Sequence, residues 1–353
     1  MAKPVVNAVY YPSWKMYKGK PPSSLRLQSV THVLYAFVRV NIDGTLRLLD
    51  EWGDLRKEVD GETGCLAAFV KLKRQHPHIK TVVSVGGGSG SAEFPVLAAN
   101  PTARATFAQS AREFCDKYQF NGIDIDWEHP TTAEQGSNFL QLLHDVRKCL
   151  PSPQYLLMTA LPTGTYCLKN IDLKSAAHYL DFLNLMGYDF TRGWTEVAGH
   201  HAQLHAPKDS LLHLVKPDNK KSCAQGVDYV LGTGFPSQKV LLGIPAYARY
   251  FPKATNIGRS SHKSAGEVDY CDMPQHWLQN ADVDMELGAA AFVDKEKGFA
   301  SFDVPKSVAM KASYANAMKL GGLFYWTGLG DRDGAESLVD AGYRELMRRD
   351  ASC

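Results

Sequence analysis

The sequence predicts an α/β fold, a (β/α)8 TIM barrel that forms a single domain over residues 1–353. Apolar strand-like runs alternate with amphipathic helix-like segments along nearly the whole chain, which is the pattern of repeated βα units and a parallel sheet. The chain has 353 residues and a hydrophobic content of 44%, enough to bury a large core. Because α/β barrels commonly form one domain at this length, one domain is the default expectation.

Eight segments have the length and apolar character of strands, and eight strands close naturally into a barrel. The expected strands are Val5–Tyr11, His32–Val38, Thr81–Val85, Ile123–Trp127, Leu156–Ala160, Phe182–Met186, Val240–Ile244 and Leu323–Trp326. The clearest helices are Thr102–Tyr118, Thr132–Leu150, Ser307–Leu320 and Ala335–Arg348. In the first of these helices Ala105, Phe107, Ala108, Ala111 and Phe114 recur at helical spacing, so this stripe is expected to face the core.

The most informative stretch is Asn121–Pro130, which reads NGIDIDWEHP. Strand side chains alternate between two faces, so Asp124, Asp126 and Glu128 share one face, opposite an apolar face. Same-face neighbours on a strand lie about 6.5 to 7 Å apart. At that spacing, in a poorly hydrated site, we expect at least one of the three carboxyl groups to hold a proton near neutral pH.

A solvated acidic strand is the alternative interpretation of this row. The opposite face, Ile123, Ile125 and Trp127, is apolar and needs a cover, which the flanking helical segments supply. The acidic face then points into the barrel, where burying carboxylates costs several kcal/mol unless they are hydrogen-bonded, protonated or used in chemistry. Glu128 lies at the carboxyl end of its strand, the end where barrel enzymes gather their functional groups.

This stretch resembles the DxxDxDxE signature of family 18 glycoside hydrolases, the chitinase family. The departure is Asn121, where the family usually has Asp; it lies at the start of the strand, so we expect the change to be tolerated. Three further motifs follow the family's order, and the resemblance covers the whole chain. They are Ser84–Gly87 (SxGG), Met186–Asp189 (MxYD) and Gly243–Arg249 after the seventh strand.

The resemblance implies roles around the acidic row. Tyr10 and Ser84 would hydrogen-bond it, with Ser84 acting on Asp124. Tyr188 and Asp189 would hold the acetamido group of a sugar. Taken alone, the glycines of residues 86–90 could instead cradle a phosphate, but neither a following Lys-Ser/Thr pair nor a dinucleotide spacing is present.

The resemblance also implies an aromatic groove. Trp14 would lie toward the non-reducing side, Trp194 on the leaving-group side, and Trp326 under the sugar whose bond is cut. Tyr247 would line the groove, with Arg249 as a weaker candidate. Aromatic residues at strand ends can also simply seal a barrel, but their apolar ring faces suit sugar rings.

Most glycosidases place two carboxylates on opposite sides of the bond that is cut, and no opposing carboxylate is visible in this sequence. Family 18 enzymes use the substrate's own 2-acetamido oxygen as nucleophile. The resemblance therefore implies retaining hydrolysis of β-1,4 bonds between N-acetylglucosamine units through an oxazolinium intermediate. Glu128 would be the acid and base, and Asp126 would stabilise the acetamido nitrogen and keep the proton on Glu128. Asp124 would act through Asp126.

Two other functions remain open at this stage. A non-catalytic chitin-binding lectin of the same family typically lacks the acid, which is present here as Glu128. An endo-N-acetylglucosaminidase acting on glycoprotein glycans uses similar carboxylate spacing, although Trp194, Tyr247 and Trp326 fit the chitinase pattern better.

Residues 251–302 form an irregular stretch at the place where family 18 members often carry a small α+β insertion that forms one wall of the groove. The stretch is short, so a shallow wall is expected. The absence of a visible leader, a binding module or a deep insertion favours soluble chito-oligosaccharides over crystalline chitin as the main substrate.

The composition limits the possible partners. A net charge of +2, with basic residues spread along the chain, does not suggest a nucleic-acid or anionic-membrane partner, and no apolar run approaches the roughly 18 residues that cross a bilayer. The seven cysteines lack metal-type spacing, so we expect free thiols, no metal and no cofactor. A cytoplasmic monomer is the expectation, although a secreted chain whose leader had been removed would look the same.

Overall fold

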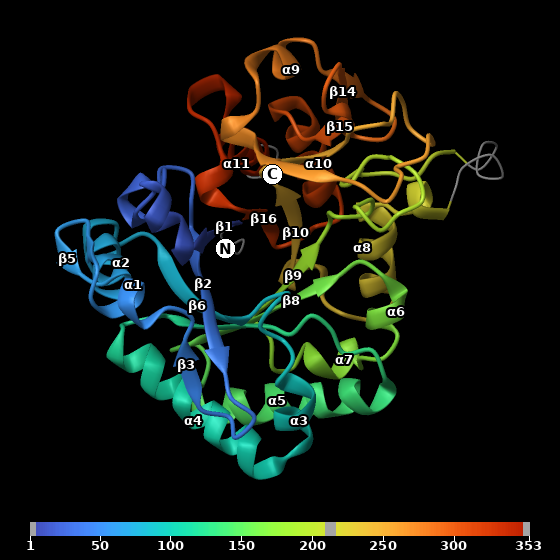
Figure 1. Cartoon of the computed structure of the whole chain (residues 1–353). Coiled ribbons are helices and arrows are strands. Elements are labelled where there is room, and N and C mark those ends of the chain that lie inside the picture. The colour runs from blue at the N-terminus through green and yellow to red at the C-terminus, as the bar shows by residue number, and fades with distance from the viewer. Residues whose placement is uncertain (1–4, 209–216, 349–353) are drawn as a thin grey trace.

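The computed structural model describes residues 5–208 and 217–348, which include a closed barrel of eight parallel strands (Figure 1). Strands pair in the order β1-β16-β10-β9-β8-β7-β6-β2, and pairing between β2 and β1 closes the barrel. All eight predicted strands are present, with ends shifted by at most two residues, so the predicted fold class is confirmed. The strands are β1 Val6–Pro12, β2 His32–Val40, β6 Lys80–Gly86, β7 Gly122–Asp126, β8 Leu156–Pro162, β9 Phe182–Met186, β10 Val240–Pro245 and β16 Gly322–Trp326.

Helices surround this barrel, and the four that the sequence predicts are present. They begin where side chains can accept hydrogen bonds from free backbone N–H groups: Asn100 caps α4, Thr132 caps α5 and Ser337 caps α11. The longer helices are α2 Cys65–Gln75, α4 Pro101–Lys117, α5 Ala133–Cys149, α8 Cys223–Gly232, α10 Pro305–Ala317 and α11 Leu338–Met347. The shorter ones are α1 Glu51–Leu55, α3 Phe94–Ala99, α6 Thr165–Leu168, α7 Leu173–Ala176 and α9 Gln275–Gln279.

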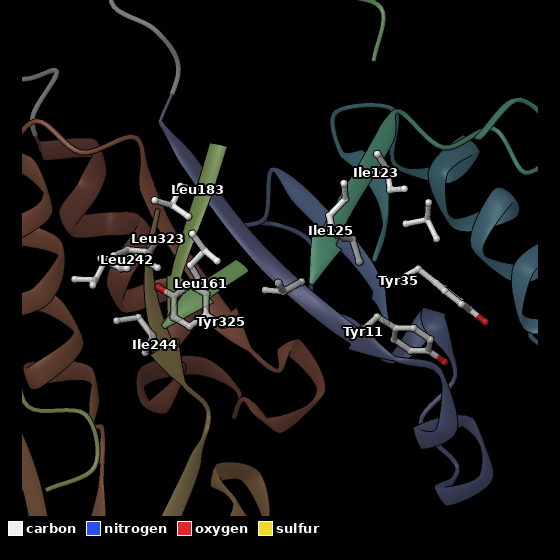
Figure 2. Close-up of a cluster of buried hydrophobic side chains, with 14 of the residues drawn as sticks. Tyr11, Tyr35, Ile123, Ile125, Leu161, Leu183, Leu242, Ile244, Leu323 and Tyr325 are labelled. Carbon is white, nitrogen blue, oxygen red and sulfur yellow. The ribbon is translucent and has the colours of Figure 1, made fainter. Parts of the chain in front are cut away.

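The apolar side chains form two main layers. The larger cluster fills the space between strands and helices, and Figure 2 shows part of it, including Ile123 and Ile125 of β7 and Leu323 of β16. A smaller cluster lies inside the barrel and contains Tyr10, Phe37, Met158 and Phe324, with Tyr188 and Trp326 packed against it. The barrel interior is therefore a packed core with an aromatic end, where β1, β9 and β16 finish.

A five-stranded antiparallel sheet follows β10, in the order β12-β11-β15-β14-β13. It begins at Tyr247 rather than at the predicted Phe251, because β11 follows β10 after a single intervening residue, Ala246. Figure 1 shows α9, β14 and β15 on the opposite side of the molecule from α4 and α5. The remaining strands are β3 Leu46–Leu48, β4 Glu58–Val59, β5 Glu62–Thr63, β11 Tyr247–Phe251, β12 Gly266–Asp269, β13 Asp282–Asp284, β14 Ala289–Asp294 and β15 Gly298–Phe302.

Two further expectations concern helices and cysteines. Within residues 5–208 and 217–348, the helices lack the length and apolar character that crossing a bilayer requires. All six cysteines in these ranges are free thiols, and Cys353 lies outside the described residues.

Candidate active site

The acidic row occupies the barrel-facing side of β7. Ser84 and Gly86 of β6 pair with Asp124 and Asp126, which are 0% and 4% exposed. On the opposite face the ring of Trp127 stacks on Phe94 with centroids 5.6 Å apart, as the apolar half of the pattern predicts. The alternation along β7 therefore places the carboxylates inside the barrel and rejects the solvated-strand interpretation.

Asp124 is held by three polar neighbours from three strands. The hydroxyls of Tyr10 and Ser84 both donate to Oδ2, at 2.8 and 2.7 Å. These are the contacts that the resemblance implied for Tyr10 and Ser84. Asn184 of β9 donates to the Tyr10 hydroxyl at 3.0 Å and to Asp124 Oδ1 at 3.4 Å. Sequence reasoning missed Asn184, although a lone polar residue within an apolar strand was a usable signal.

All three carboxyl groups have raised pKa values, mainly because they are buried. Burial raises the pKa of Asp124 to about 6, although the hydrogen bonds from Ser84 and Tyr10 oppose the shift. Burial and the charges of Glu128 and Asp124 raise the pKa of Asp126 well above its usual range, and its Oδ1 has no hydrogen-bond partner among the described residues. Burial also raises the pKa of Glu128, against the nearby charge of Arg192. Asp126 thus competes with Glu128 for a proton in the unliganded protein, whereas the resemblance implied only that Asp126 keeps the proton on Glu128.

Glu128 follows β7 directly and keeps 28% of its side chain exposed. Its backbone N–H donates to Ser91 Oγ at 2.9 Å, and Gly88 lies against its carboxylate, since a Cβ on Gly88 would lie 3.6 Å from each carboxylate oxygen. His129 Nε2 lies 4.0 Å from Glu128 Oε2. Because the glycine-rich loop lies against a carboxylate of the protein itself, the phosphate interpretation of residues 86–90 gains no support.

Asp189, at the end of the MxYD motif, receives several hydrogen bonds and ion pairs. Tyr247 Oη donates to Oδ1 at 2.9 Å, and Arg249 donates from Nε to Oδ1 at 2.9 Å and from Nη2 to Oδ2 at 3.1 Å. Arg192 Nη1 lies 3.2 Å from Oδ2. Burial would raise the pKa of Asp189, but His201, whose Nδ1 lies 3.8 Å from Oδ1, and the hydrogen bonds from Arg249 outweigh it and hold that pKa well below its usual range. The sequence did not indicate Arg192 or His201, because both lie in an irregular loop.

The buried Tyr188 hydroxyl is influenced by the charges of both groups, the acidic row and Asp189. Burial, followed by the charges of Asp126, Glu128 and Asp189, raises the pKa of Tyr188 well above its usual range. The MxYD tyrosine therefore lies close to the acidic row, and its ring contacts Tyr247 at a centroid distance of 6.2 Å.

Of the three predicted groove tryptophans, Trp14 and Trp326 belong to one aromatic cluster and Trp194 does not. The Trp326 ring lies 5.4 Å from Tyr10, 5.7 Å from Phe37 and 6.4 Å from Trp14, measured between centroids. Trp14 remains 38% exposed. Trp194 lies apart and is 65% exposed, with the Arg192 guanidinium 4.2 Å over its ring. Phe37 of β2 completes the cluster, and sequence reasoning missed it because it lies within an apolar run.

Asn121, the departure from the family signature, joins two strands at the opposite end of β7. Its Oδ1 accepts the Thr81 backbone N–H at 2.9 Å, and its own backbone N–H donates to the Thr81 carbonyl at 2.7 Å. A carboxylate and an amide oxygen can both accept this bond, so Asn121 makes a hydrogen bond that Asp could also make there.

The family model described as "Glycosyl hydrolases family 18" matches residues 6–331. "Chitinase 1" of Aphanocladium album is 31% identical, covering 98% of this chain and 86% of that protein. "Endochitinase 1" of Metarhizium robertsii is 30% identical, covering 97% of this chain and 85% of that protein.

Solved structures agree on the fold. The Ostrinia furnacalis Group IV chitinase in complex with allosamidin is 26% identical, with a TM-score of 0.85, covering 98% of this chain and 100% of that chain. The immunomodulatory active chitinase TsES1 from Trichuris suis is similar in fold, with a TM-score of 0.84 at 24% identity, covering 98% of this chain and 100% of that chain.

Proposed function

Because the chain belongs to family 18 of the glycosyl hydrolases, we propose that this chitinase cleaves β-1,4 bonds between N-acetylglucosamine units with retention of configuration. One observation carries the proposal: the buried acidic row ends in the partly exposed Glu128, and the charges of Asp126 and Glu128 both act on the buried Tyr188 hydroxyl. A proton donor and a group suited to an acetamide are thus adjacent.

In the proposed first step, the substrate's acetamido oxygen attacks the anomeric carbon while Glu128 gives its proton to the leaving glycosidic oxygen. The product is an oxazolinium ion. Water then attacks the same carbon, Glu128 takes the water's proton, and the configuration is retained. Attack from within the substrate avoids the entropy of collecting a separate nucleophile, a saving that can reach several kcal/mol.

The proton must lie on Glu128 at the start, although Asp126 competes for it in the unliganded protein. An acetamido N–H that donates to Asp126 would stabilise its carboxylate and lower its pKa. Substrate binding would thus favour the ionised form of Asp126 and leave the proton on Glu128. The unpartnered Oδ1 of Asp126 supports this role, because it is a buried acceptor that lacks a donor among the described residues.

The substrate that we propose is a soluble chito-oligosaccharide. The sheet that carries residues 251–302 would form one wall of the groove, since its first strand supplies Tyr247 and Arg249 to Asp189. Trp14 would stack a sugar on the non-reducing side, Trp326 would lie under the sugar whose bond is cut, and Trp194 would stack one on the leaving-group side. The free thiols of the six described cysteines are compatible with the reducing compartment that we propose, the cytoplasm.

Replacement of the acid tests the proposal. Glu128→Gln should lower turnover of chito-oligosaccharides by about 1,000-fold or more, with oligosaccharide affinity largely retained, because the amide keeps the shape and loses the proton. Glu134→Gln, an exposed glutamate in the first turn of α5, is the matched control and should behave like the parent protein. Near-normal turnover by Glu128→Gln would end the proposal.

The same assay tests whether the substrate's acetamido group is the nucleophile. Partly de-acetylated oligomers should not be cut where the sugar at the cleavage position lacks its acetyl group, and mapping of the products measures this. Release of N-glycans in place of chito-oligosaccharide cleavage would favour the endo-N-acetylglucosaminidase alternative, and binding without any hydrolysis would favour the lectin.

A further inference from the structure

Arg39, near the end of β2, is a buried arginine with an unusual set of partners. It is 9% exposed and, within the part of the chain that the structure describes, forms no ion pair with a carboxylate. Its Nη1 donates to the Gly86 carbonyl at 2.5 Å and its Nη2 to Ser89 Oγ at 2.8 Å. The charge of Glu93, whose Oε1 lies 4.0 Å from Arg47 Nη2, favours the charged guanidinium, but burial and the charge of Arg47 outweigh it and lower the pKa of Arg39. These two hydrogen bonds therefore matter for the position of Arg39.

Both contacts end on the loop of residues 86–91, which reads GGGSGS and is called the glycine loop below. The loop is shaped to accept the guanidinium, because a Cβ at Gly90 would lie 1.5 Å from Arg39 Nη1. Gly86 and Gly87 have φ values of +115° and +79°, which side chains rarely adopt. The loop conformation and the position of Arg39 therefore depend on each other.

The glycine loop in turn holds Glu128 at two points. Ser91 Oγ accepts the Glu128 backbone N–H at 2.9 Å and donates to the Gly87 carbonyl at 3.0 Å. Gly88 lies against the Glu128 carboxylate, because a Cβ on Gly88 would lie 3.6 Å from each of its oxygens, and the Gly88 N–H lowers the pKa of that carboxyl group. Gly87 N–H also donates to the Asp126 carbonyl at 2.8 Å, which ties the loop to the end of β7.

We propose that Arg39 and Ser91 are positioning residues for the acid Glu128, acting through the glycine loop that places Gly88 against its carboxylate. This inference rests on the proposed function, because it assigns Glu128 the role of acid. Arg39 holds the loop through its hydrogen bonds to Gly86 and Ser89, and Ser91 holds the backbone of Glu128 just after β7 ends. Neither residue touches the substrate or the reacting atoms in this arrangement.

The Gly88 N–H stabilises the ionised form of Glu128, so it opposes the rise in the pKa of Glu128 that burial causes. Loss of that donor should raise the pKa of Glu128 further. The enzyme needs the protonated acid, so the basic limb of the kcat/KM profile should move to higher pH. The other charged or titratable groups near Glu128 stay in place in the variants: Asp126, His129, Tyr166, Tyr188, Asp189 and Arg192.

The test compares Arg39→Met and Ser91→Ala with Arg47→Met. Arg47 is the matched control because it pairs directly with Arg39 across β2 and β3, carries the same charge and has a side chain that is 49% exposed. Arg39→Met should lower kcat by about 10- to 100-fold, since displacement of a catalytic group by about 1 Å costs about that much. It should also move the basic limb of the pH profile upward, with KM little changed. Ser91→Ala should lower kcat in the same range.

Thermal unfolding accompanies each assay, and Ser91→Ala keeps the test decisive if Arg39→Met does not fold. Parent-like kcat and pH profile in the folded Arg39 or Ser91 variant would overturn the inference. A lower kcat with an unmoved basic limb in both variants would also overturn it, because that result indicates a structural role alone. If Glu128→Gln itself stays active, the proposed function fails independently of these variants.

Discussion

Asp124→Asn should make the protein more stable at neutral pH while it lowers activity. Burial raises the pKa of Asp124 from 3.8 to about 6, so its ionised form destabilises the folded state relative to the unfolded one. This rise in the pKa of Asp124, by about 2, corresponds to about 3 kcal/mol of folding free energy, because a pKa change of one corresponds to about 1.4 kcal/mol. The group is fully buried, so solvent screening does not reduce this figure appreciably.

The hydrogen bonds around Asp124 can survive the substitution. Tyr10 and Ser84 donate to the same oxygen, Oδ2, so an asparagine that places its carbonyl oxygen there keeps both bonds. The new amide nitrogen faces Asn184, whose Oδ1 is buried without a partner among the described residues and can accept a bond after an amide flip. We therefore expect a gain of about 2 to 3 kcal/mol above pH 7.

The sign of the pH dependence follows from the raised pKa. A carboxyl group whose folded pKa is raised favours the folded state at low pH, and this contribution is lost as pH rises from about 3.8 through about 6. The advantage of Asp124→Asn should therefore be largest above pH 7 and fall below about 1 kcal/mol near pH 4. At an unfolding entropy of about 2 cal/mol/K per residue, 2 to 3 kcal/mol in 353 residues raises Tm by about 3 to 4 °C.

Urea unfolding at pH 4 and pH 7.5 measures this difference, and chito-oligosaccharide turnover at pH 7.5 measures the activity. Asp282→Asn, an exposed aspartate in β13, is the control and should show no pH-dependent gain. Turnover should fall less than in Asp126→Asn, because Asp124 acts through Asp126. An equal effect of Asp124→Asn at both pH values, or a loss of stability at pH 7.5, would refute the reasoning.

Two further predictions concern other parts of the chain. Lys311 Nζ and Asp303 Oδ2 form an ion pair of 2.5 Å, with side chains 0% and 1% exposed. Lys311→Met should therefore lower the free energy of unfolding in urea by about 3 to 5 kcal/mol, because it leaves a buried charge without a partner. Lys306→Met, at an exposed position on the same helix, should lower it little, and similar losses in both variants would contradict the argument. Trp14→Ala should weaken binding of chito-oligosaccharides by inactive Glu128→Gln protein about 10-fold, from loss of one stacking ring. Trp52→Ala, 60% exposed on α1, is the control in calorimetric titration, and unchanged affinity on removal of Trp14 would contradict the stacking role.

The sequence predicted the barrel well because each βα unit carries its own local signals. Apolar runs and helix caps, such as Asn100 and Thr132, depend on neighbouring residues only. The face of the acidic row was equally readable, since strand alternation fixes it and Trp127 has to pack against helices.

The remaining features depend on contacts between distant segments, which no local pattern encodes. Asn184 reaches Asp124 across 60 positions of the sequence, and Arg39 reaches the Gly86 carbonyl across 47. Arg192 approaches Asp189 from an irregular loop. The competition of Asp126 with Glu128 for a proton depends on how deeply each is buried, which becomes known only when the barrel closes.

The anchoring of Asp189 has a practical consequence for the construction of chimaeras. Tyr247 and Arg249 belong to β11, the first strand of the antiparallel sheet, yet they serve a residue of the barrel loop that follows β9. A graft that exchanges the whole sheet between two relatives would remove both partners from Asp189. A junction placed after Phe251 would keep them with the recipient barrel, so wall length could be altered without loss of that anchor.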